Sequence, residues 1–273
     1  MTPKLRERTV SSPAPSVQNG FSLISNEKLL QLYAAMLKCR MIADRTRILA
    51  QQNHFSGRQA SLGQEAAMVG LAMDLLPGDH IATNPGNVVP FFIKGSQTQG
   101  FSLESLLSAL LKSSAQKPDS ANHFKSATKA AKANKQAKNK DIAVALCGAT
   151  APFDSWREAL NVATLKDLPL IFLSWNHVPL KKNEYGLPAI NVDGNDVVAV
   201  YRVASEAIAH ARIGNGPTLI ECRTDDHNSG DPILNMEKYL GRKGLFREEF
   251  KSNVETLFAG ELDVAMTAAK PKG

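Results

Sequence analysis

The chain has 273 residues, of which 43% are hydrophobic, so it is long enough to bury a substantial core and lies near the upper size limit of a single domain. It contains no run of about 18 consecutive apolar residues, and its first residues lack the apolar stretch of a secretion signal, which predicts a cytoplasmic protein. Three scattered cysteines without a CxxC pair exclude a disulfide framework and favour reduced thiols.

The first part of the chain is predicted to be mainly helical. Residues 1–22 combine prolines with serine and basic residues, a composition that cannot bury enough apolar surface, so we expect a disordered N-terminal arm. Between residues 25 and 52, apolar side chains recur at three- and four-residue spacing, which predicts a helix. A second helix is expected near residues 61–76, where Pro77-Gly78-Asp79 ends it before a short strand at His80–Thr83.

The later part of the chain alternates between buried strands and helices. Apolar segments over residues 142–146, 168–175 and 217–222 predict strands. Ser155 and Glu158 have the spacing of a capping box that opens a helix, and helical periodicity returns between residues 196 and 212. Strands separated by helices of this length favour an α/β fold, with a parallel β-sheet covered by helices on both faces.

Positive charge gathers in one segment. The formal net charge is +6, and between residues 112 and 140 eight lysines stand against Asp119 as the only acid. Five of these lysines recur at three- and four-residue spacing on one side of a predicted helix: Lys125, Lys129, Lys132, Lys135 and Lys138. Such a face can bind an acidic protein partner or a phosphate backbone, or it can simply be solvated. Because no arginine or aromatic residue is interleaved, nucleic acid is disfavoured.

Four short strings occur in the order, and near the spacing, of one known family. They are Gly63-Gln64-Glu65-Ala66 with Pro77-Gly78-Asp79; Glu158-Ala159-Leu160-Asn161 with Leu168-Pro169; Val192-Asp193-Gly194-Asn195-Asp196; and Gly216-Pro217-Thr218-Leu219-Ile220-Glu221. On these strings the chain resembles the alpha subunit of the thiamine diphosphate-dependent decarboxylating (dehydrogenase) component of pyruvate-type and branched-chain 2-oxo acid dehydrogenase complexes. The resemblance covers about residues 25–255. We therefore predict one thiamine diphosphate-binding-like domain over residues 23–258 and a C-terminal tail over residues 259–273.

The resemblance implies both a fold and an activity. The fold would be the thiamine diphosphate-binding fold, with the diphosphate held through a divalent ion such as Mg²⁺ at the carboxyl ends of the strands. The activity would be oxidative decarboxylation of a 2-oxo acid, an oxidoreductase reaction that passes the acyl unit to a lipoyl group. The resemblance also implies a beta-type subunit that supplies the rest of the site, or association into a homo-oligomer.

The positions that bind the metal ion in the family carry different residues here. In the family, an Asp in a Gly-Asp-Gly turn and an Asn after the next strand are the ligands. At the family's spacing, the Asp falls on Gly148, or on Cys147 if one residue is inserted, and the Asn pair falls on Asn176 and His177. Gly148, Ala149 and Asn176 are thus the remnant coenzyme-binding positions, and Cys147 and His177 the candidate metal positions. A thiolate with an imidazole suits zinc better than Mg²⁺, and a small buried thiol with a loop histidine is the simpler interpretation.

Further changes remove groups that would bind the diphosphate. A family Tyr-Arg pair whose Arg meets phosphate falls on Pro85-Gly86, and a second pair is replaced near Asp225-Asp226, whose carboxylates would repel a diphosphate. His227 keeps the family's spacing to Asp231-Pro232 and is the candidate catalytic acid or base. We favour a surface-loop histidine without a catalytic task, because the pocket that it would serve is eroded.

Three hypotheses stay open. The chain is an alpha subunit with weak or unusual coenzyme binding, a non-catalytic structural or regulatory relative of that subunit, or a basic binding protein that uses the Lys125–Lys138 helix face. The residues favour the second for mechanism because the metal and diphosphate groups are lost together, whereas the first best describes descent. The sequence does not determine the 2-oxo acid, the partner subunit or the oligomeric state.

Overall fold

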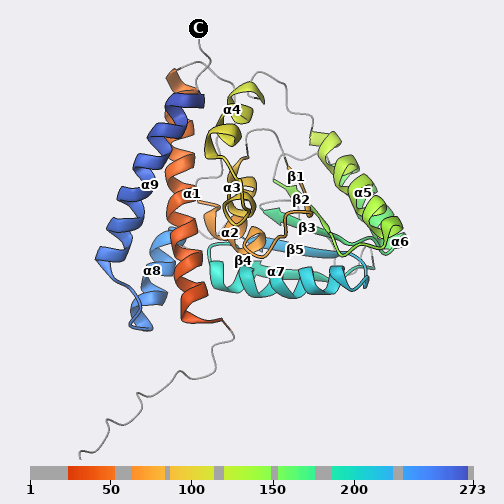
Figure 1. Cartoon of the computed structure of the whole chain (residues 1–273). Helices are drawn as coiled ribbons and strands as arrows, with labels where there is room; N and C mark the ends of the chain where they lie inside the picture. Colours follow the sequence, from red (N-terminus) through yellow and green to blue (C-terminus); the bar gives the residue numbers. More distant parts are fainter. Residues whose placement is uncertain are drawn as a thin grey trace, which may run out of the picture.

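A parallel β-sheet forms the centre of the molecule (Figure 1). The structure is a computed structural model that describes residues 24–52, 63–83, 87–113, 120–148, 153–175, 186–223 and 230–269. The described chain contributes five strands: β1 (His80–Ala82), β2 (Ala143–Cys147), β3 (Leu170–Trp175), β4 (Ala189–Asp193) and β5 (Thr218–Arg223). Their spatial order is β1-β2-β3-β5-β4, and each neighbouring pair runs parallel.

The central strands are buried on both faces. In β2 and β3, one core receives Val144, Leu146, Ile171 and Leu173, and the other receives Ala143, Ala145, Cys147, Leu170 and Phe172. Successive side chains of a strand point to opposite faces, so these unbroken apolar runs suit a sheet that is covered twice. The predicted α/β class and the parallel sheet with helices on both faces are confirmed.

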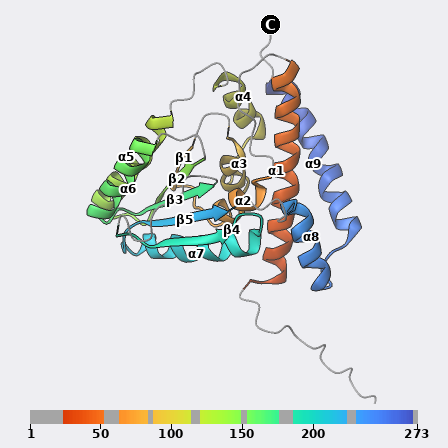
Figure 2. The ribbon, with the colours of Figure 1, turned by 180° about the vertical axis from the view of Figure 1, so that it is seen from behind.

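Helices provide the two covers. On one face lie α5 (Ser120–Ala137) and α6 (Phe153–Leu165), and on the other lie α2 (Glu65–Ala72) and α7 (Val197–Arg212). The remaining described helices are α1 (Asn26–Gln52), α3 (Val89–Ser96), α4 (Leu103–Ser113), α8 (Pro232–Arg242) and α9 (Glu248–Ala269). In Figure 2, α1, α8 and α9 form a layer at one side of the molecule, and α5 and α6 lie at the opposite side.

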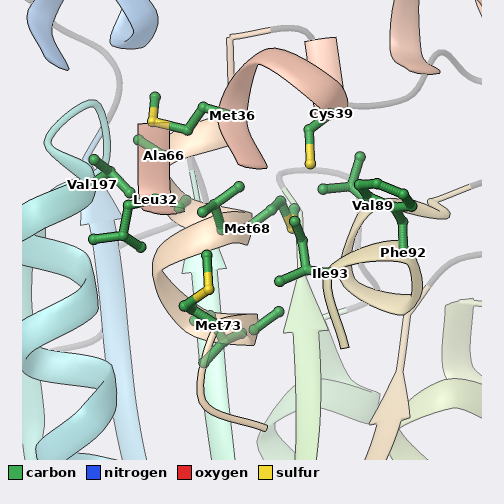
Figure 3. Close-up of a cluster of buried hydrophobic side chains, with 14 of the residues drawn as sticks. Leu32, Met36, Cys39, Ala66, Met68, Met73, Val89, Phe92, Ile93 and Val197 are labelled. Atoms are coloured by element: carbon green, nitrogen blue, oxygen red, sulfur yellow. The ribbon is translucent and has the colours of Figure 1, made fainter. Parts of the chain in front are cut away.

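Helix α2 is fully buried, and a glycine sets how closely it packs. A Cβ atom built on Gly70 would lie 2.7 Å from Cγ1 of Val200 and 2.9 Å from the backbone nitrogen of Tyr201, so only glycine allows α2 to lie this close to α7. Figure 3 shows side chains of several helices gathered in one core around α2: Leu32, Met36 and Cys39 of α1, Ala66 and Met68 of α2, Val89, Phe92 and Ile93 of α3, and Val197 of α7.

Most elements that periodicity predicts are present, with shifted ends. The helix expected at residues 25–52 is α1, and the strand expected at residues 142–146 is β2. Helix α2 covers only the middle of the predicted residues 61–76, the first two of which lie outside the described residues. The capping prediction at Ser155 is wrong, because α6 begins at Phe153 and Ser155 lies inside its first turn.

The sequence patterns do not predict β4, α3, α4, α8 or α9. Strand β4 is an edge strand whose side chains alternate between exposed and half-buried, so it carries no strong apolar run. Helix α9 continues without a break through residue 258, where the domain is expected to end, and Leu262 and Met266 in the predicted tail are buried. The arm expected over residues 1–22 lies outside the described residues.

The described chain also bears on the expectations about membranes and thiols. None of its helices has both the length and the apolar character needed to cross a membrane. Cys39, Cys147 and Cys222 are all buried and free, so no disulfide contributes to this fold.

Candidate functional site

The carboxyl ends of β2 and β3 are the candidate site, because ligands of parallel α/β sheets bind at this edge. The two strands are in register, with Cys147 of β2 opposite Ser174 of β3. Gly148 and Trp175, the next residue of each strand, therefore lie side by side at the edge. Cys147, Gly148 and Ser174 are buried, and Trp175 is partly buried against the larger core.

The indole of Trp175 covers Gly148. A Cβ atom built on Gly148 would lie 3.3 Å from both Cζ2 and Nε1 of Trp175, so the ring packs directly against the glycine backbone. A methyl group fits there with a small adjustment, but a carboxylate would displace the indole. The indole of Trp175 thus occupies the space beside Gly148, the position where the resemblance expects a metal-binding aspartate.

Cys147 is a buried thiol rather than a metal-ready thiolate. Its side chain has no exposed surface and belongs to the core beneath α5 and α6. Its Sγ makes a weak contact with the carbonyl oxygen of Gly148, at 3.8 Å. Burial raises the pKa of the Cys147 thiol far above its usual value, so it stays protonated at neutral pH. A protonated thiol is a poor ligand, and even a thiolate is too soft for Mg²⁺.

These residues do not fit a Mg²⁺–diphosphate group. Carboxylate and amide oxygens are the usual protein ligands of such a hard cation, whereas the described ends of β2 and β3 hold no carboxylate: they offer a neutral thiol, a glycine, the buried hydroxyl of Ser174 and an indole. In the ranges that the structure describes, no group of three or more His, Cys, Asp or Glu side chains is placed to hold a metal ion. Ala149, Asn176 and His177 lie outside the described residues, as do Pro85-Gly86 and Asp225-Asp226, so their predicted roles stay predictions.

His227 also lies outside the described residues, but the elements before and after it are described. Strand β5 ends at Arg223, and the carboxylate of Asp231 caps α8 by accepting hydrogen bonds from the amides of Ile233 and Leu234. Burial raises the pKa of Asp231, but the hydrogen bond and charge of Arg40, together with those two amides, outweigh it and hold the pKa below its ordinary value. The Asp231-Pro232 string is thereby explained as a helix start.

Arg40 joins three helices through two carboxylates, and sequence reasoning missed it. Its Nε lies 2.5 Å from Oε1 of Glu65, and its Nη1 lies 2.8 Å from Oδ2 of Asp231. The Glu65 side chain is only 1% exposed, so Arg40 compensates a buried charge. A usable signal was present: Arg40 follows Met36 by four residues and precedes Ala43 by three, on the buried side of α1.

The Pro77-Gly78-Asp79 string serves the opposite edge of the sheet. The Asp79 carboxylate, with no exposed surface, accepts hydrogen bonds from the amides of Leu76 and Ile142 and pairs with Arg212 at 2.6 Å. Ile142 precedes β2 and Arg212 ends α7, so Asp79 ties together three segments where the strands begin. This family-like string therefore has a structural explanation.

The Val192–Asp196 string forms a strand, a turn and a helix start. Asp193 ends β4, and its Oδ1 accepts a hydrogen bond from the amide of Asn195 at 2.8 Å. Asp196 caps α7 by accepting from the amides of Val198 and Ala199, as expected for an aspartate at a helix N-terminus. Asp193 lies at the carboxyl edge, but two strands, β3 and β5, stand between β4 and β2, so three strand spacings put β4 about 14 Å from β2.

Comparison with known proteins gives one family and several relatives. A family model described as "Dehydrogenase E1 component" matches residues 33–178 and 180–239. The alpha subunit of acetoin:2,6-dichlorophenolindophenol oxidoreductase from Bacillus subtilis (strain 168) is 29% identical over 241 residues, which covers 76% of this chain and 72% of that protein. The alpha subunit of the pyruvate dehydrogenase E1 component from Staphylococcus epidermidis is 26% identical over an alignment of 299 residues, which covers 90% of this chain and 79% of that protein.

Other relatives match over a shorter stretch. The chloroplastic pyruvate dehydrogenase E1 component subunit alpha-3 from Arabidopsis thaliana is 32% identical over 152 residues, which covers 42% of this chain. The matched stretch spans only 36% of the Arabidopsis protein's length. The similarity is therefore broad for some relatives and confined to part of the chain for others.

Proposed function

This chain belongs to the dehydrogenase E1 component family, and we propose that it is an alpha-type subunit that retains the sheet and its partner surface but holds thiamine diphosphate and Mg²⁺ weakly or not at all. One observation carries the proposal. At the carboxyl ends of β2 and β3 stand a protonated thiol, a glycine and the indole of Trp175, where an anionic coenzyme needs a cation and oxygen ligands. The chain then acts as a non-catalytic structural or regulatory subunit.

The names of the relatives support the role of the scaffold. Both the Bacillus oxidoreductase and the Staphylococcus dehydrogenase proteins are alpha subunits, a term that itself implies assembly with another subunit. The buried pairs of Asp79 with Arg212 and of Arg40 with Glu65 are formed between residues of the chain itself, so these charges of the scaffold are satisfied by the fold. A beta-type subunit is the partner that we propose, and a homo-oligomer is the alternative.

Calorimetric titration of Mg²⁺ and thiamine diphosphate into the full chain, alone and mixed with a candidate beta-type subunit, tests the proposal. We expect no saturable heat at high micromolar coenzyme. The sequence contains two tryptophans, so Trp156→Phe leaves Trp175 as the single fluorescent reporter of the edge. Micromolar binding to the wild-type chain, accompanied by a change in Trp175 emission, would contradict the proposal.

A pair of matched variants shows whether the two replaced residues are responsible. Gly148→Asp combined with Trp175→Gln restores a carboxylate and removes the indole that covers its place. Gly148→Ala combined with Trp175→Gln removes the indole without adding a ligand. We expect the aspartate variant to bind the coenzyme with Mg²⁺ at least about tenfold more tightly than its alanine partner, because one well-placed carboxylate on a hard cation contributes more than about 1.4 kcal/mol.

An active alpha subunit is the second candidate function. It is favoured by the reach of the family match, which includes Asn176, His227 and the segments on both sides of them. An active chain mixed with a beta-type subunit would reduce an artificial electron acceptor in the presence of a 2-oxo acid. Co-elution with the beta-type subunit without such activity supports the non-catalytic subunit, whereas activity that depends on added coenzyme supports the second candidate.

A further inference from the structure

A groove lies between α5 and α6 on the outer surface of the molecule, away from the carboxyl edge and from α1, α8 and α9 (Figures 1 and 2). Its volume is about 440 Å³, within the range of sites that bind ligands or single anchoring side chains. Nothing in the proposed function uses it.

One wall of the groove is a row of lysines on α5. Lys125, Lys129 and Lys132 line it, at spacings of four and three residues that place them on one side of the helix. The side of α5 that faces the sheet is anchored, because Ala127 and Ala131 are buried in the core beneath it. The row is therefore held in a fixed place rather than carried on a loose segment.

The charge of the groove is strongly unbalanced. Helix α5 contains no acidic residue, and among the described residues that line the groove Glu158 of α6 is the only acid. Lys135, one turn further along α5, is already occupied, since its Nζ donates to the carbonyl oxygens of Lys166 and Asp167 at 2.6 and 3.1 Å. That contact holds the end of α6 against α5 and leaves the three groove lysines to face a ligand.

The inside of the groove is apolar. Phe124 of α5 and Ala159 and Val162 of α6 line it between the lysines and Glu158. A ligand that combines carboxylates with an aliphatic side chain matches both the lysine wall and the apolar interior of the groove. The groove lysines from Lys125 to Lys132 extend about 10 Å at the helical rise per residue, a spacing that suits successive acidic side chains of a peptide. Lysine without arginine or aromatic side chains is a poor match to nucleic acid.

We propose that the groove between α5 and α6 docks an acidic peptide segment of a partner protein, with carboxylates against Lys125, Lys129 and Lys132 and one apolar side chain between Phe124 and Val162. The lysine helix is then an interaction surface that is independent of the coenzyme site. The result of a docking experiment therefore does not decide the proposed function, because the groove and the coenzyme site lie on different elements.

Fluorescence anisotropy with a labelled synthetic peptide tests the docking on the full chain. The probe carries glutamates at three- and four-residue spacing and one leucine, and a second probe has that leucine replaced by glycine. We expect saturable binding of the leucine probe and at least about fivefold weaker binding of the glycine probe, because burying an aliphatic side chain contributes more than about 1 kcal/mol. Equal binding of the two probes would remove the apolar part of the proposal.

Two charge-reversal variants separate the groove from net charge. Lys125→Glu, Lys129→Glu and Lys132→Glu together should weaken binding at least about tenfold. The control reverses three exposed basic residues on α7 and α8, Arg202→Glu, Lys238→Glu and Arg242→Glu, which changes the net charge equally. An equal loss in both variants would overturn the proposal, as would tighter binding of a single-stranded oligonucleotide than of the peptide.

A third variant makes the opposite prediction and guards against loss through misfolding. Glu158→Gln removes the acid on the α6 wall, so the acidic probe should bind about two- to fivefold more tightly, in line with the small energies of exposed charge pairs. Circular dichroism of all variants should match the wild-type chain. Unchanged or weaker binding by Glu158→Gln would count against docking in this groove.

Discussion

The two edges of the sheet differ in their chemistry. At the edge where the strands begin, Asp79 is a fully buried carboxylate that two backbone amides and Arg212 satisfy. At the edge where β2 and β3 end, the described residues are neutral: Cys147 is a protonated thiol, and Gly148 is covered by Trp175. The first edge is held together by a buried ion pair, whereas the described residues at the ends of β2 and β3 carry no charge.

The two edges therefore differ in what a substitution costs. Breaking one member of a buried ion pair leaves an uncompensated charge and is costly, so the Asp79 edge cannot change without loss of stability. The described ends of β2 and β3 carry no charged side chain, so a substitution there leaves no charge uncompensated.

The largest expected effect comes from breaking the charged edge. Asp79→Asn removes the charge that Arg212 neutralises and should lower the free energy of unfolding by about 3–5 kcal/mol. Chemical denaturation followed by circular dichroism measures it. Asp193→Asn at the exposed end of β4 is the control, and it should change stability by no more than about 0.5 kcal/mol, because an amide oxygen can still accept from Asn195.

A double variant refines this result. Arg212→Met in the Asp79→Asn background removes the unpaired guanidinium and should recover part of the lost stability. If Asp79→Asn alone lowers the free energy of unfolding by less than about 1 kcal/mol, the ion pair of Asp79 with Arg212 is not what stabilises this edge.

The second effect concerns the thiol at the neutral edge. In a chain that carries Cys39→Ser and Cys222→Ser, Cys147 should react with a disulfide reagent at pH 7.5 at least about a hundredfold more slowly than in denaturant, because burial keeps it protonated and covered. The absorbance of the released thiol measures the rate. Rapid reaction of the native chain would mean that the edge is open and the thiolate is accessible.

The same treatment of Cys222 provides a comparison with a cysteine on a different strand. Burial, with a smaller contribution from Asp193, raises the pKa of Cys222 to about 12. A chain that retains only Cys222 should therefore also be slow, and a large difference between the two thiols would show that one strand end opens without the other.

The smallest effects come from adding one methyl group at each edge. A Cβ atom on Gly78 would lie 2.5 Å from both carboxylate oxygens of Asp141, so Gly78→Ala should cost about 1–3 kcal/mol. A Cβ atom on Gly148 would meet Trp175 at 3.3 Å, so Gly148→Ala should cost less than about 1 kcal/mol. Thermal unfolding of the two variants side by side measures the difference, and the reverse order would contradict the comparison of the edges.

Periodicity and composition were sufficient for the central elements. The apolar spacing in α1 and the continuous apolar runs of β2 and β3 report directly which faces are buried, and they predicted a parallel α/β sheet correctly. The lysine row was likewise placed correctly on one side of a helix, although Lys138 lies just beyond the end of α5. The edge strand β4 was missed because its side chains alternate between exposed and half-buried, without an apolar run. Helix α9 was missed although its buried residues Phe258, Leu262 and Met266 recur at helical spacing.

The candidate site was predictable only as positions along the chain. Counting residues placed Cys147 and Gly148 at a strand end, which the structure confirms, but nothing in the sequence indicated that Trp175 would cover the glycine. That contact depends on the register of two strands and on the side of β3 to which residue 175 points.

Local apolar spacing and short strings of residues suffice for the α/β class, for the positions of the main strands and helices, and for the family to which the chain belongs. The place of β5 between β3 and β4, and the contact of Arg40 with an aspartate 191 residues away, become visible in the folded chain alone. A buried charge must pair with whichever opposite charge the fold brings beside it, and the distance along the chain does not indicate which residue that is.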